Sequence, residues 1–220
     1  MRSKPQDLDI TERYKLLIGC IVPRPIAFVS TVSATGVANV APFSFFSGVG
    51  SNPMTLLFCP GNAADGSEKD TLRNAKPVAE GGGGDFVVNL AREDYVRQVV
   101  AAAEILPPEE SEFTAVGLTE EESEIVRSPR VAESPVAFEC RTLQVIRTNP
   151  GRPAGGNVVL GEVVYVHIDD ELLDDRMRVD PARLRAVGRM GGAGYSTTRD
   201  RFEIPRGLAA LEVPDPFGEL

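Results

Sequence analysis

The stretch between residues 20 and 61 constrains the fold of this chain most, because short apolar runs alternate there with turn residues. Residues 26–32 are rich in β-branched and aromatic side chains, and an Ala-Thr-Gly turn follows them. Residues 37–41 and 54–59 are further apolar runs, with Pro42 and an Asn-Pro pair between them. Runs this short, bounded by Gly, Pro and Asn, predict β-strands connected by tight turns.

Polar side chains occur inside or beside these apolar runs, where a strand with a purely structural role would carry few of them. They are Ser30, Thr31, Asn39, Ser44 and Ser47. Buried hydroxyl and amide groups need hydrogen-bond partners. Those partners can be backbone groups or a polar ligand, and the sequence alone leaves both interpretations open.

Two prolines hold a single cation near the start of this stretch. Pro23 and Pro25 flank Arg24 and restrict the backbone on both sides of it. One interpretation is an extended entry into a strand, with the guanidinium solvated. The other is an arginine held rigid at the rim of a ligand site.

A second candidate site lies where a short helical pattern begins. Lys69, Asp70 and Thr71 precede the helical run at 72–75. Free backbone N–H groups and the positive end of a helix dipole favour an anion, so a Lys and a hydroxyl there could bind one. The alternative is a plain N-cap by Asp70 or Thr71, and caps are much commoner than anion sites.

The remaining sequence adds strands, one clear helix and several connecting segments. Residues 14–19 fit either a helical turn or an edge strand, and Gly81 to Gly84 predict a flexible loop. Residues 109–124 are an acidic, solvated excursion with at most a short helix, and the tail after Phe202 is acidic and Pro-rich. The other expected elements are a strand at 86–90, a helix at 92–106 with Tyr95, Val96, Val99 and Val100 on one face, a hairpin of strands at 136–146 and 157–169, and a short helix at 182–186.

This order of elements predicts a mainly β fold. About six or seven strands are expected, and the long crossover helices of a doubly wound sheet are missing. A mostly antiparallel barrel or sandwich fits best. With 220 residues, the chain is long enough for one domain with a substantial core.

Composition argues against several classes of partner. The formal net charge of -9 argues against nucleic acid and anionic membrane surfaces, because both favour a basic patch. No apolar run approaches ~18 residues, so no membrane span is expected, and the first ten residues lack the apolar core of a signal peptide. Cys20, Cys59 and Cys140 are isolated, which predicts neither a disulfide framework nor a metal site, and a reducing cytoplasm is the expected compartment.

The sequence contains no recognisable pairing of a nucleophile with a base. His167 is the only histidine and lies in the middle of an expected strand, so we interpret it as a surface or barrel-lining residue. No Gly-x-Ser-x-Gly motif occurs anywhere in the chain. We therefore predict no catalytic side chain and no metal ligand. If the protein is an enzyme, its chemistry is expected to come from a cofactor.

Several motifs, taken in order, resemble the flavin reductase-like family of FMN-binding split β-barrels. The first is PRPIAFVST at 23–31, and GVANVAPFSFF follows it at 36–46. Lys-Asp-Thr with Asn74, then FVVN at 86–89 and GRMGGAGY at 188–195, come later in the chain. Each motif is weak alone, but together they extend over about residues 10–196.

The resemblance implies an architecture and an assembly. It implies a six-stranded antiparallel split barrel, mainly β with a few helices and with Greek-key-like connections. It implies one FMN-binding domain over residues 1–220, with a core at about 10–196 and a C-terminal tail at 197–220. It also implies a homodimer with FMN at the interface, where each site is built from both chains.

Carried over residue by residue, the resemblance also implies a set of cofactor-binding residues. Near the ribityl chain and the phosphate it would place Ser30, Thr31, Ser44, Lys69, Asp70 and Thr71. Around the isoalloxazine ring and its rim it would place Asn39, Ala41, Pro42, Arg24, Arg189 and Tyr195.

The activity implied by the resemblance is that of an NAD(P)H:flavin oxidoreductase. NADH or NADPH would pass hydride to N5 of FMN, and the reduced flavin would pass electrons to a monooxygenase or another acceptor. Two alternatives remain. One is an FMN-binding electron-transfer protein without NAD(P)H reductase activity, and the other is a non-catalytic interaction protein built on a barrel scaffold.

Overall fold

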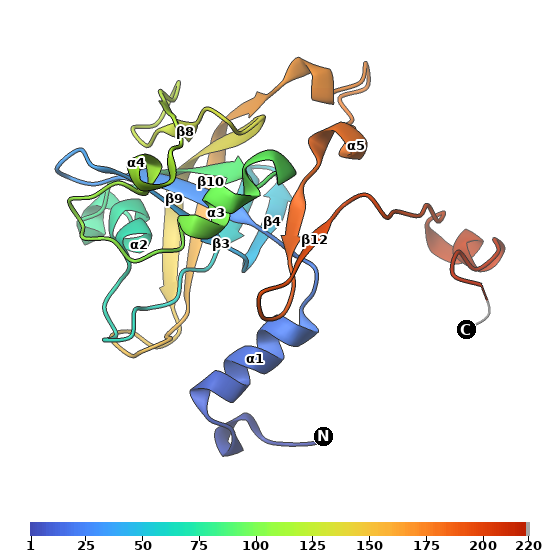
Figure 1. The fold of residues 1–220 in the computed structure, drawn as a ribbon, viewed down its shortest axis with the longest axis horizontal. Helices are drawn as coiled ribbons and strands as arrows, with labels where there is room; N and C mark the ends of the chain where they lie inside the picture. Colours follow the sequence, from blue (N-terminus) through green and yellow to red (C-terminus); the bar gives the residue numbers. More distant parts are fainter. Residues whose placement is uncertain (219–220) are drawn as a thin grey trace.

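Figure 1 shows a computed structural model of the chain, which describes residues 1–218. Strands are its main regular elements. They are β1 (Arg24–Pro25), β2 (Ala27–Val32), β3 (Ala38–Phe43), β4 (Phe46–Ser51), β5 (Met54–Phe58), β6 (Asp85–Leu90), β7 (Glu120–Glu121), β8 (Arg130–Val131), β9 (Val136–Arg147), β10 (Asn157–Ile168), β11 (Val187–Arg189) and β12 (Tyr195–Thr197).

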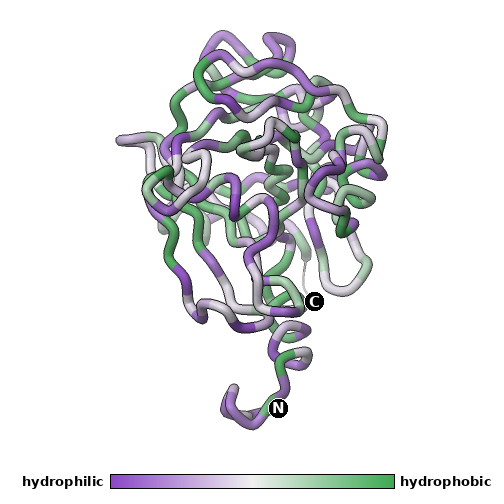
Figure 2. Tube along the Cα trace, turned by 90° about the vertical axis from the view of Figure 1, so that its left-hand side faces the viewer, coloured by the Kyte–Doolittle hydropathy of each residue, from purple (hydrophilic) through white to green (hydrophobic). Residues whose placement is uncertain are grey.

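The helices are short, apart from one at the N-terminus. They are α1 (Ile10–Cys20), α2 (Asp70–Ala75), α3 (Val96–Ala101), α4 (Glu112–Val116) and α5 (Pro181–Leu184), with 3-10 turns η1 (Pro5–Asp7), η2 (Val78–Glu80), η3 (Glu93–Tyr95), η4 (Asp170–Leu172) and η5 (Gly207–Leu211). Figures 1 and 2 show α1 projecting from the body of the molecule, and Figure 1 shows the C-terminal segment extending away from it as well. Within residues 1–218, no helix has both the length and the apolar character needed to cross a membrane.

Seven strands form one sheet in the order β3-β2-β6-β9-β10-β5-β4, and every neighbouring pair in it is antiparallel. A three-stranded sheet, β1-β11-β12, and a two-stranded ribbon, β7-β8, complete the β structure. The predicted fold class, mainly β and antiparallel with a few helices, is therefore confirmed.

The seven-stranded sheet curls into a split barrel. Its edge strands are β3 and β4, yet only Ser44 and Phe45 separate them in the chain. The three peptide units from Phe43 to Phe46 span at most roughly 11 Å, so the two edges of the sheet must lie close together. The Cys59 N–H donates to the Phe45 carbonyl at 2.8 Å, which holds this connection against the end of β5.

Strand β2 is buried on both faces and separates two apolar clusters. Alternate residues of a strand point to opposite faces, so Phe28 packs under α3 while Val29 packs inside the barrel. The same alternation sends Ser30 and Thr31 to opposite faces. The cluster under α3 includes Ile26, Phe28, Val40, Tyr95, Val99, Phe113 and Val187, and the barrel cluster includes Ala27, Val29, Phe58, Leu72, Phe86, Cys140 and Val159.

Most strand predictions are confirmed. The runs at 26–32, 37–41, 54–59 and 86–90 form β2, β3, β5 and β6, and the predicted hairpin is β9 with β10. Strand β4, whose residues are FSGVGS, was not predicted. Five of its six residues are exposed, so no apolar run marks it.

The predicted helix at 92–106 is wrong at both ends. The chain makes the 3-10 turn η3 first, and α3 then ends at Ala101. The Ala103 and Glu104 N–H groups donate to the carbonyls of Val100 and Ala101, three residues back, so the helix tightens and stops well before Pro107. Val100, predicted to share one face with Tyr95 and Val99, is 42% exposed, whereas those two are buried.

The structure decides between the two alternatives for residues 14–19, and it differs from the prediction for the loop at 81–84. Residues 14–19 lie in helix α1, which begins with a capping box between Asp9 and Glu12. The four-glycine loop is held in place, because the Gly83 N–H donates to the Asn74 carbonyl at 2.6 Å. A Cβ at Gly82 would lie 2.1 Å from the Lys76 carbonyl oxygen, so glycine is needed there for a close approach rather than for flexibility.

Candidate functional site

Half of the predicted cofactor-binding residues gather around one cavity of about 470 Å³. The cavity lies between the edge strand β3, the segment that leads into α2, and residues 102–108. Its volume falls within the roughly 300–1,000 Å³ typical of small-molecule sites. The predicted residues that line it are Asn39, Ala41, Pro42, Lys69, Asp70 and Thr71.

The side chain of Asn39 connects three elements at the wall of this cavity. Its Oδ1 accepts hydrogen bonds from Thr71 Oγ1 at 2.9 Å and from Thr31 Oγ1 at 3.3 Å, and its Nδ2 donates to Glu112 Oε2 at 2.8 Å. Thr31 Oγ1 in turn accepts from Asn74 Nδ2 at 3.1 Å. Thr31 is fully buried and does not line the cavity. Thr31 therefore holds the Asn39 side chain from the side that faces away from the cavity.

Ser30 lies elsewhere, on the opposite face of β2. It is fully buried, and its Oγ donates to the Pro129 carbonyl and accepts from Asn89 Nδ2 at 3.0 Å. Asn89 Oδ1 also accepts the Val131 N–H at 2.9 Å. Ser30 and Thr31 are consecutive in a strand, so their side chains point to opposite faces of the sheet. In this geometry Ser30 fastens the segment around β8 to the sheet.

Arg24 and Ser44 meet each other away from this cavity. Arg24 is 3% exposed, so its guanidinium is buried rather than solvated. It donates to the carbonyls of Ile18 at 2.5 Å, Ile21 at 2.8 Å and Met190 at 3.0 Å, and its Nε donates to Ser44 Oγ at 3.1 Å. Arg24 therefore holds the C-terminal end of α1 against Met190, the residue that follows β11.

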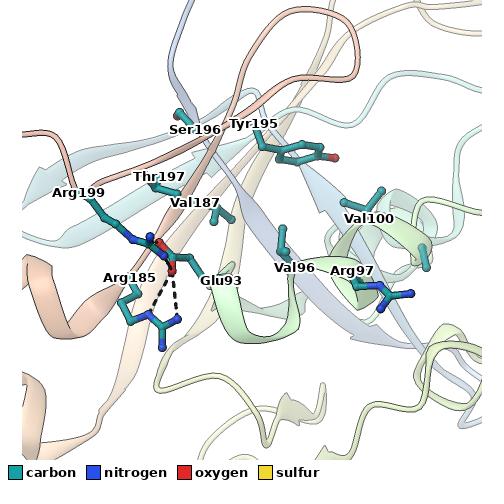
Figure 3. Close-up of a pocket in the computed structure, with 11 residues that line it drawn as sticks. Glu93, Val96, Arg97, Val100, Arg185, Val187, Tyr195, Ser196, Thr197 and Arg199 are labelled. Atoms are coloured by element: carbon teal, nitrogen blue, oxygen red, sulfur yellow. Dashed lines mark hydrogen bonds and ion pairs between the residues drawn. The ribbon is translucent and has the colours of Figure 1, made fainter.

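Arg189 and Tyr195 lie together beside a second, more open depression of about 740 Å³ between α3 and β12. The Arg189 guanidinium lies 4.4 Å from the centroid of the Tyr195 ring. Figure 3 shows Tyr195 above the apolar side chains of α3, with Glu93 paired to Arg185 at the other end. Ala101 lines this depression and Ala102 lines the first cavity. The depression and the cavity therefore lie on either side of the C-terminal end of α3.

Carboxylates outnumber cations around the first cavity. Its acids are Asp65, Glu68, Asp70, Glu104 and Glu112, and its cations are Lys69 and Arg73. Glu68 pairs with Lys76 at 2.8 Å and with Arg147 at 2.9 Å, and Asp70 pairs with Arg73. Within the described part of the chain, Lys69 has no ion-pair partner and Glu112 has no cation paired with it.

Glu112 is the cavity residue that the sequence analysis missed, because it belongs to the acidic segment interpreted as solvated. It is 6% exposed, and its Oε2 accepts both Asn39 Nδ2 and the Val40 N–H, the latter at 3.2 Å. Burial raises the pKa of Glu112, and the nearby charge of Asp70 adds to the rise. Hydrogen bonds from Asn39, from Val40 and from its own backbone oppose the rise without cancelling it.

His167 lies on β10, away from the cavity, and contacts a buried acid. Its Nε2 lies 2.6 Å from Glu139 Oε1. The Glu139 carboxylate also accepts the backbone N–H groups of Glu124, Ile125 and Val126 at 2.7, 2.7 and 3.1 Å. Burial opposes the ionisation of Glu139, but these hydrogen bonds outweigh it and hold its pKa below the usual value. This pair fastens the loop at 122–128 to the sheet.

Across residues 1–218, no group of three or more His, Cys, Asp or Glu side chains is placed to hold a metal ion. Cys20, Cys59 and Cys140 are free thiols.

Comparison with known proteins gives consistent matches over nearly the whole chain. The profile of the flavin reductase like domain matches residues 18–183. An uncharacterised protein of Halalkalibacterium halodurans is 39% identical over 208 residues, which cover 94% of this chain and 96% of that protein.

Two solved structures are similar in three dimensions. Nitrilotriacetate monooxygenase component B from Bacillus cereus is 34% identical with a TM-score of 0.85, covering 93% of this chain and 98% of that chain. A protein with a split barrel domain from Shewanella frigidimarina is 20% identical with a TM-score of 0.78, covering 94% of this chain and 100% of that chain, and it shows the same fold.

Proposed function

This chain belongs to the flavin reductase-like family, and we propose that it is an FMN-binding flavoprotein that catalyses NAD(P)H-dependent reduction of flavin. One observation carries the proposal. Six motif residues from two distant parts of the sequence, 39–42 and 69–71, meet around one cavity of about 470 Å³. The similarity to a monooxygenase component B supports a role in supplying reduced flavin to a monooxygenase or another acceptor.

The residues around the cavity fit most parts of FMN. A flavin needs an apolar wall for its ring, polar groups for its ribityl chain and a cation for its phosphate. Ala41 and Pro42 offer the wall, Asn39 and Thr71 offer the amide and the hydroxyl, and Lys69 offers an unpaired ammonium. The excess of carboxylates is the part that does not fit a phosphate dianion, and protonation or cations from a second chain would remove the conflict.

Bound FMN would supply the redox chemistry by accepting hydride at N5 from NADH or NADPH. The task left to the chain is to bind and orient. Asn39 is held on one side by Thr71 and Thr31 and on the other by Glu112, so its amide is fixed before any ligand arrives. This positioning requires no general base from the protein.

We also propose that the protein is a homodimer and that the second copy covers α1. The apolar residues Ile10, Tyr14 and Leu17 of this helix and Ile21 at its C-cap recur every three or four positions, and all are exposed. Helix α1 stands outside the body of the chain (Figure 2). A partner lying against it would bury this stripe and could bring further cations to the flavin.

The experiment that tests the function is an absorbance spectrum of the purified protein before and after anaerobic addition of NADH and of NADPH. We expect a flavin spectrum that bleaches with at least one donor. A flavin spectrum that persists with both would favour the electron-transfer alternative. Absence of flavin, even after soaking with FMN, would leave only the interaction-protein alternative.

Substitution of Lys69 tests where the phosphate binds. We expect Lys69→Ala to weaken FMN binding by more than tenfold, because a charge-assisted hydrogen bond to phosphate contributes about 1.5–3 kcal/mol. Quenching of flavin fluorescence gives the Kd, and riboflavin, which lacks the phosphate, should bind the variant and the wild type alike. Lys4→Ala removes an exposed lysine outside the cavity and serves as the control. An unchanged FMN affinity in Lys69→Ala would place the phosphate elsewhere.

A further inference from the structure

We propose that Glu112 is held as a neutral carboxylic acid at the flavin cavity and donates its proton in a hydrogen bond to the anionic end of FMN. This inference rests on the proposed function, because it takes FMN as the ligand. It makes Glu112 a recognition residue for the phosphate, and it makes the affinity for FMN depend on pH while that for riboflavin does not.

The geometry leaves one carboxyl oxygen of Glu112 available to a ligand. Glu112 is the first residue of α4, and Oε2 is occupied by hydrogen bonds from Asn39 Nδ2 and the Val40 N–H. In residues 1–218, Oε1 has no hydrogen bond to another residue. The side chain lines both the 470 Å³ cavity and an adjoining one of about 200 Å³. Oε1 is therefore the atom that can meet a ligand in either space.

The surroundings of Glu112 disfavour a negative charge on it. Only 6% of the Glu112 surface is exposed. Ionising a buried carboxyl group that has no paired cation costs free energy. The cation of α2, Arg73, is already paired with Asp70, and Lys69 is exposed. The charged groups that line the two cavities with Glu112 are Asp65 and Glu68 before α2, Lys69, Asp70 and Arg73 at α2, and Glu104 and Glu110 in the segment before α4.

A phosphate dianion strengthens this preference. An ionised Glu112 would repel it, whereas a neutral acid offers an O–H donor to a phosphate oxygen. When Glu112 is ionised before binding, one proton must therefore be taken up from solvent as FMN enters. Above the pH at which Glu112 ionises, the affinity for FMN falls as the pH rises, since that proton becomes scarcer.

The test compares wild type with Glu112→Gln between pH 6 and pH 9. Glutamine keeps an acceptor for Asn39 and Val40 and presents an N–H donor where the acid presents its O–H, and this donor does not titrate. The FMN Kd values of the two proteins should lie closest together at pH 6, because the pKa of Glu112 is raised and the wild-type side chain is most protonated at the acid end of the range. At pH 9 we expect Glu112→Gln to bind FMN at least about tenfold more tightly than wild type, a difference of about 1.4 kcal/mol. Glu120→Gln, at an exposed acid that lines neither cavity, should follow the wild-type curve.

A ratio of the two FMN Kd values that stays within about twofold from pH 6 to pH 9 would overturn the inference and leave the proposed function standing. The same pH trend with riboflavin would also overturn it, because riboflavin carries no phosphate. If wild type binds no FMN at any pH, the proposed function fails, and the inference fails with it.

A second readout needs no flavin. The pKa of Glu112 is raised in the folded protein above its ordinary value of 4.5, so wild type loses stability as the pH rises from there through the folded pKa. Glu112→Gln lacks this loss. The thermal midpoint of the variant minus that of wild type, both free of flavin, should therefore be larger at pH 8 than at pH 5 by at least about 3 °C. A constant difference would show that Glu112 ionises freely and would overturn the inference.

Discussion

Replacing Glu139 by alanine should lower the free energy of unfolding by about 3–5 kcal/mol, because each buried group left without a partner costs about 1–3 kcal/mol. The Glu139 carboxylate accepts the N–H groups of Glu124, Ile125 and Val126 and lies 2.6 Å from His167 Nε2. Alanine removes the acceptor for all of them at once. Urea denaturation at pH 7 measures the loss.

The acid side of the stability profile gives an independent check on Glu139. Burial opposes its ionisation, but hydrogen bonds from His167 and the backbone outweigh it and hold the pKa of Glu139 below the usual 4.5. The stabilisation is therefore present above pH 4.5 and is lost as the pH falls through the lowered pKa. Glu139→Gln should flatten this part of the profile, since its side chain does not titrate.

Two variants serve as controls for Glu139→Ala. Glu120→Ala changes an exposed acid and should alter the stability by less than about 0.5 kcal/mol. His167→Ala should leave NAD(P)H-dependent flavin reduction nearly unchanged, because His167 contacts Glu139 and not the cavity. A Glu139→Ala protein within about 1 kcal/mol of wild type would contradict the proposed anchoring of the loop at 122–128.

Replacing Arg24 by alanine should cost about 3 kcal/mol, because hydrogen bonds that involve a charged group contribute about 1.5–3 kcal/mol each and are not additive. The guanidinium donates to Ile18, Ile21, Met190 and Ser44, so its loss frees the end of α1. If a second copy covers α1, sedimentation velocity should show a dimer for wild type and a larger monomer fraction for Arg24→Ala.

Lysine should not restore the wild-type behaviour at this position. Arg24→Lys keeps the charge but cannot reach four acceptors with one ammonium, so it should resemble Arg24→Ala. Arg13→Ala, at an exposed arginine of α1 that donates to the Leu8 carbonyl, is the matched control and should remain dimeric. Equal stability and equal dimer content in Arg24→Ala and wild type would contradict the role given to Arg24.

The candidate site could be predicted from the sequence in part. Asn39, Ala41, Pro42, Lys69 and Thr71 surround one cavity. Other predicted residues do not line this cavity, and the reason differs from one pair to the next. The resemblance places Ser30 and Thr31 beside the same part of the ligand, although strand geometry sends their side chains to opposite faces of the sheet. The resemblance assigns Arg24 and Ser44 to the ligand, although the Arg24 guanidinium donates to Ser44 Oγ and to three backbone carbonyls.

Glu112 shows most clearly what local sequence pattern does not contain. The segment 109–124 is acidic and lacks periodicity, which is typical of a solvated surface. Its burial depends on Asn39 and Val40, which are 73 and 72 positions away along the chain. The residues next to Glu112 in the sequence therefore do not predict its contacts with Asn39 and Val40.

The sequence by itself determined six of the seven strands of the large sheet, the mainly β class and the family, because alternating apolar residues, turn residues and ordered motifs are properties of neighbouring positions. Tertiary structure alone decided that the barrel splits between β3 and β4, that β4 exists despite its exposed residues, and which polar side chains face the cavity. The physical reason is that burial and hydrogen-bond partners are set by contacts between distant segments, which form only when the sheet has closed.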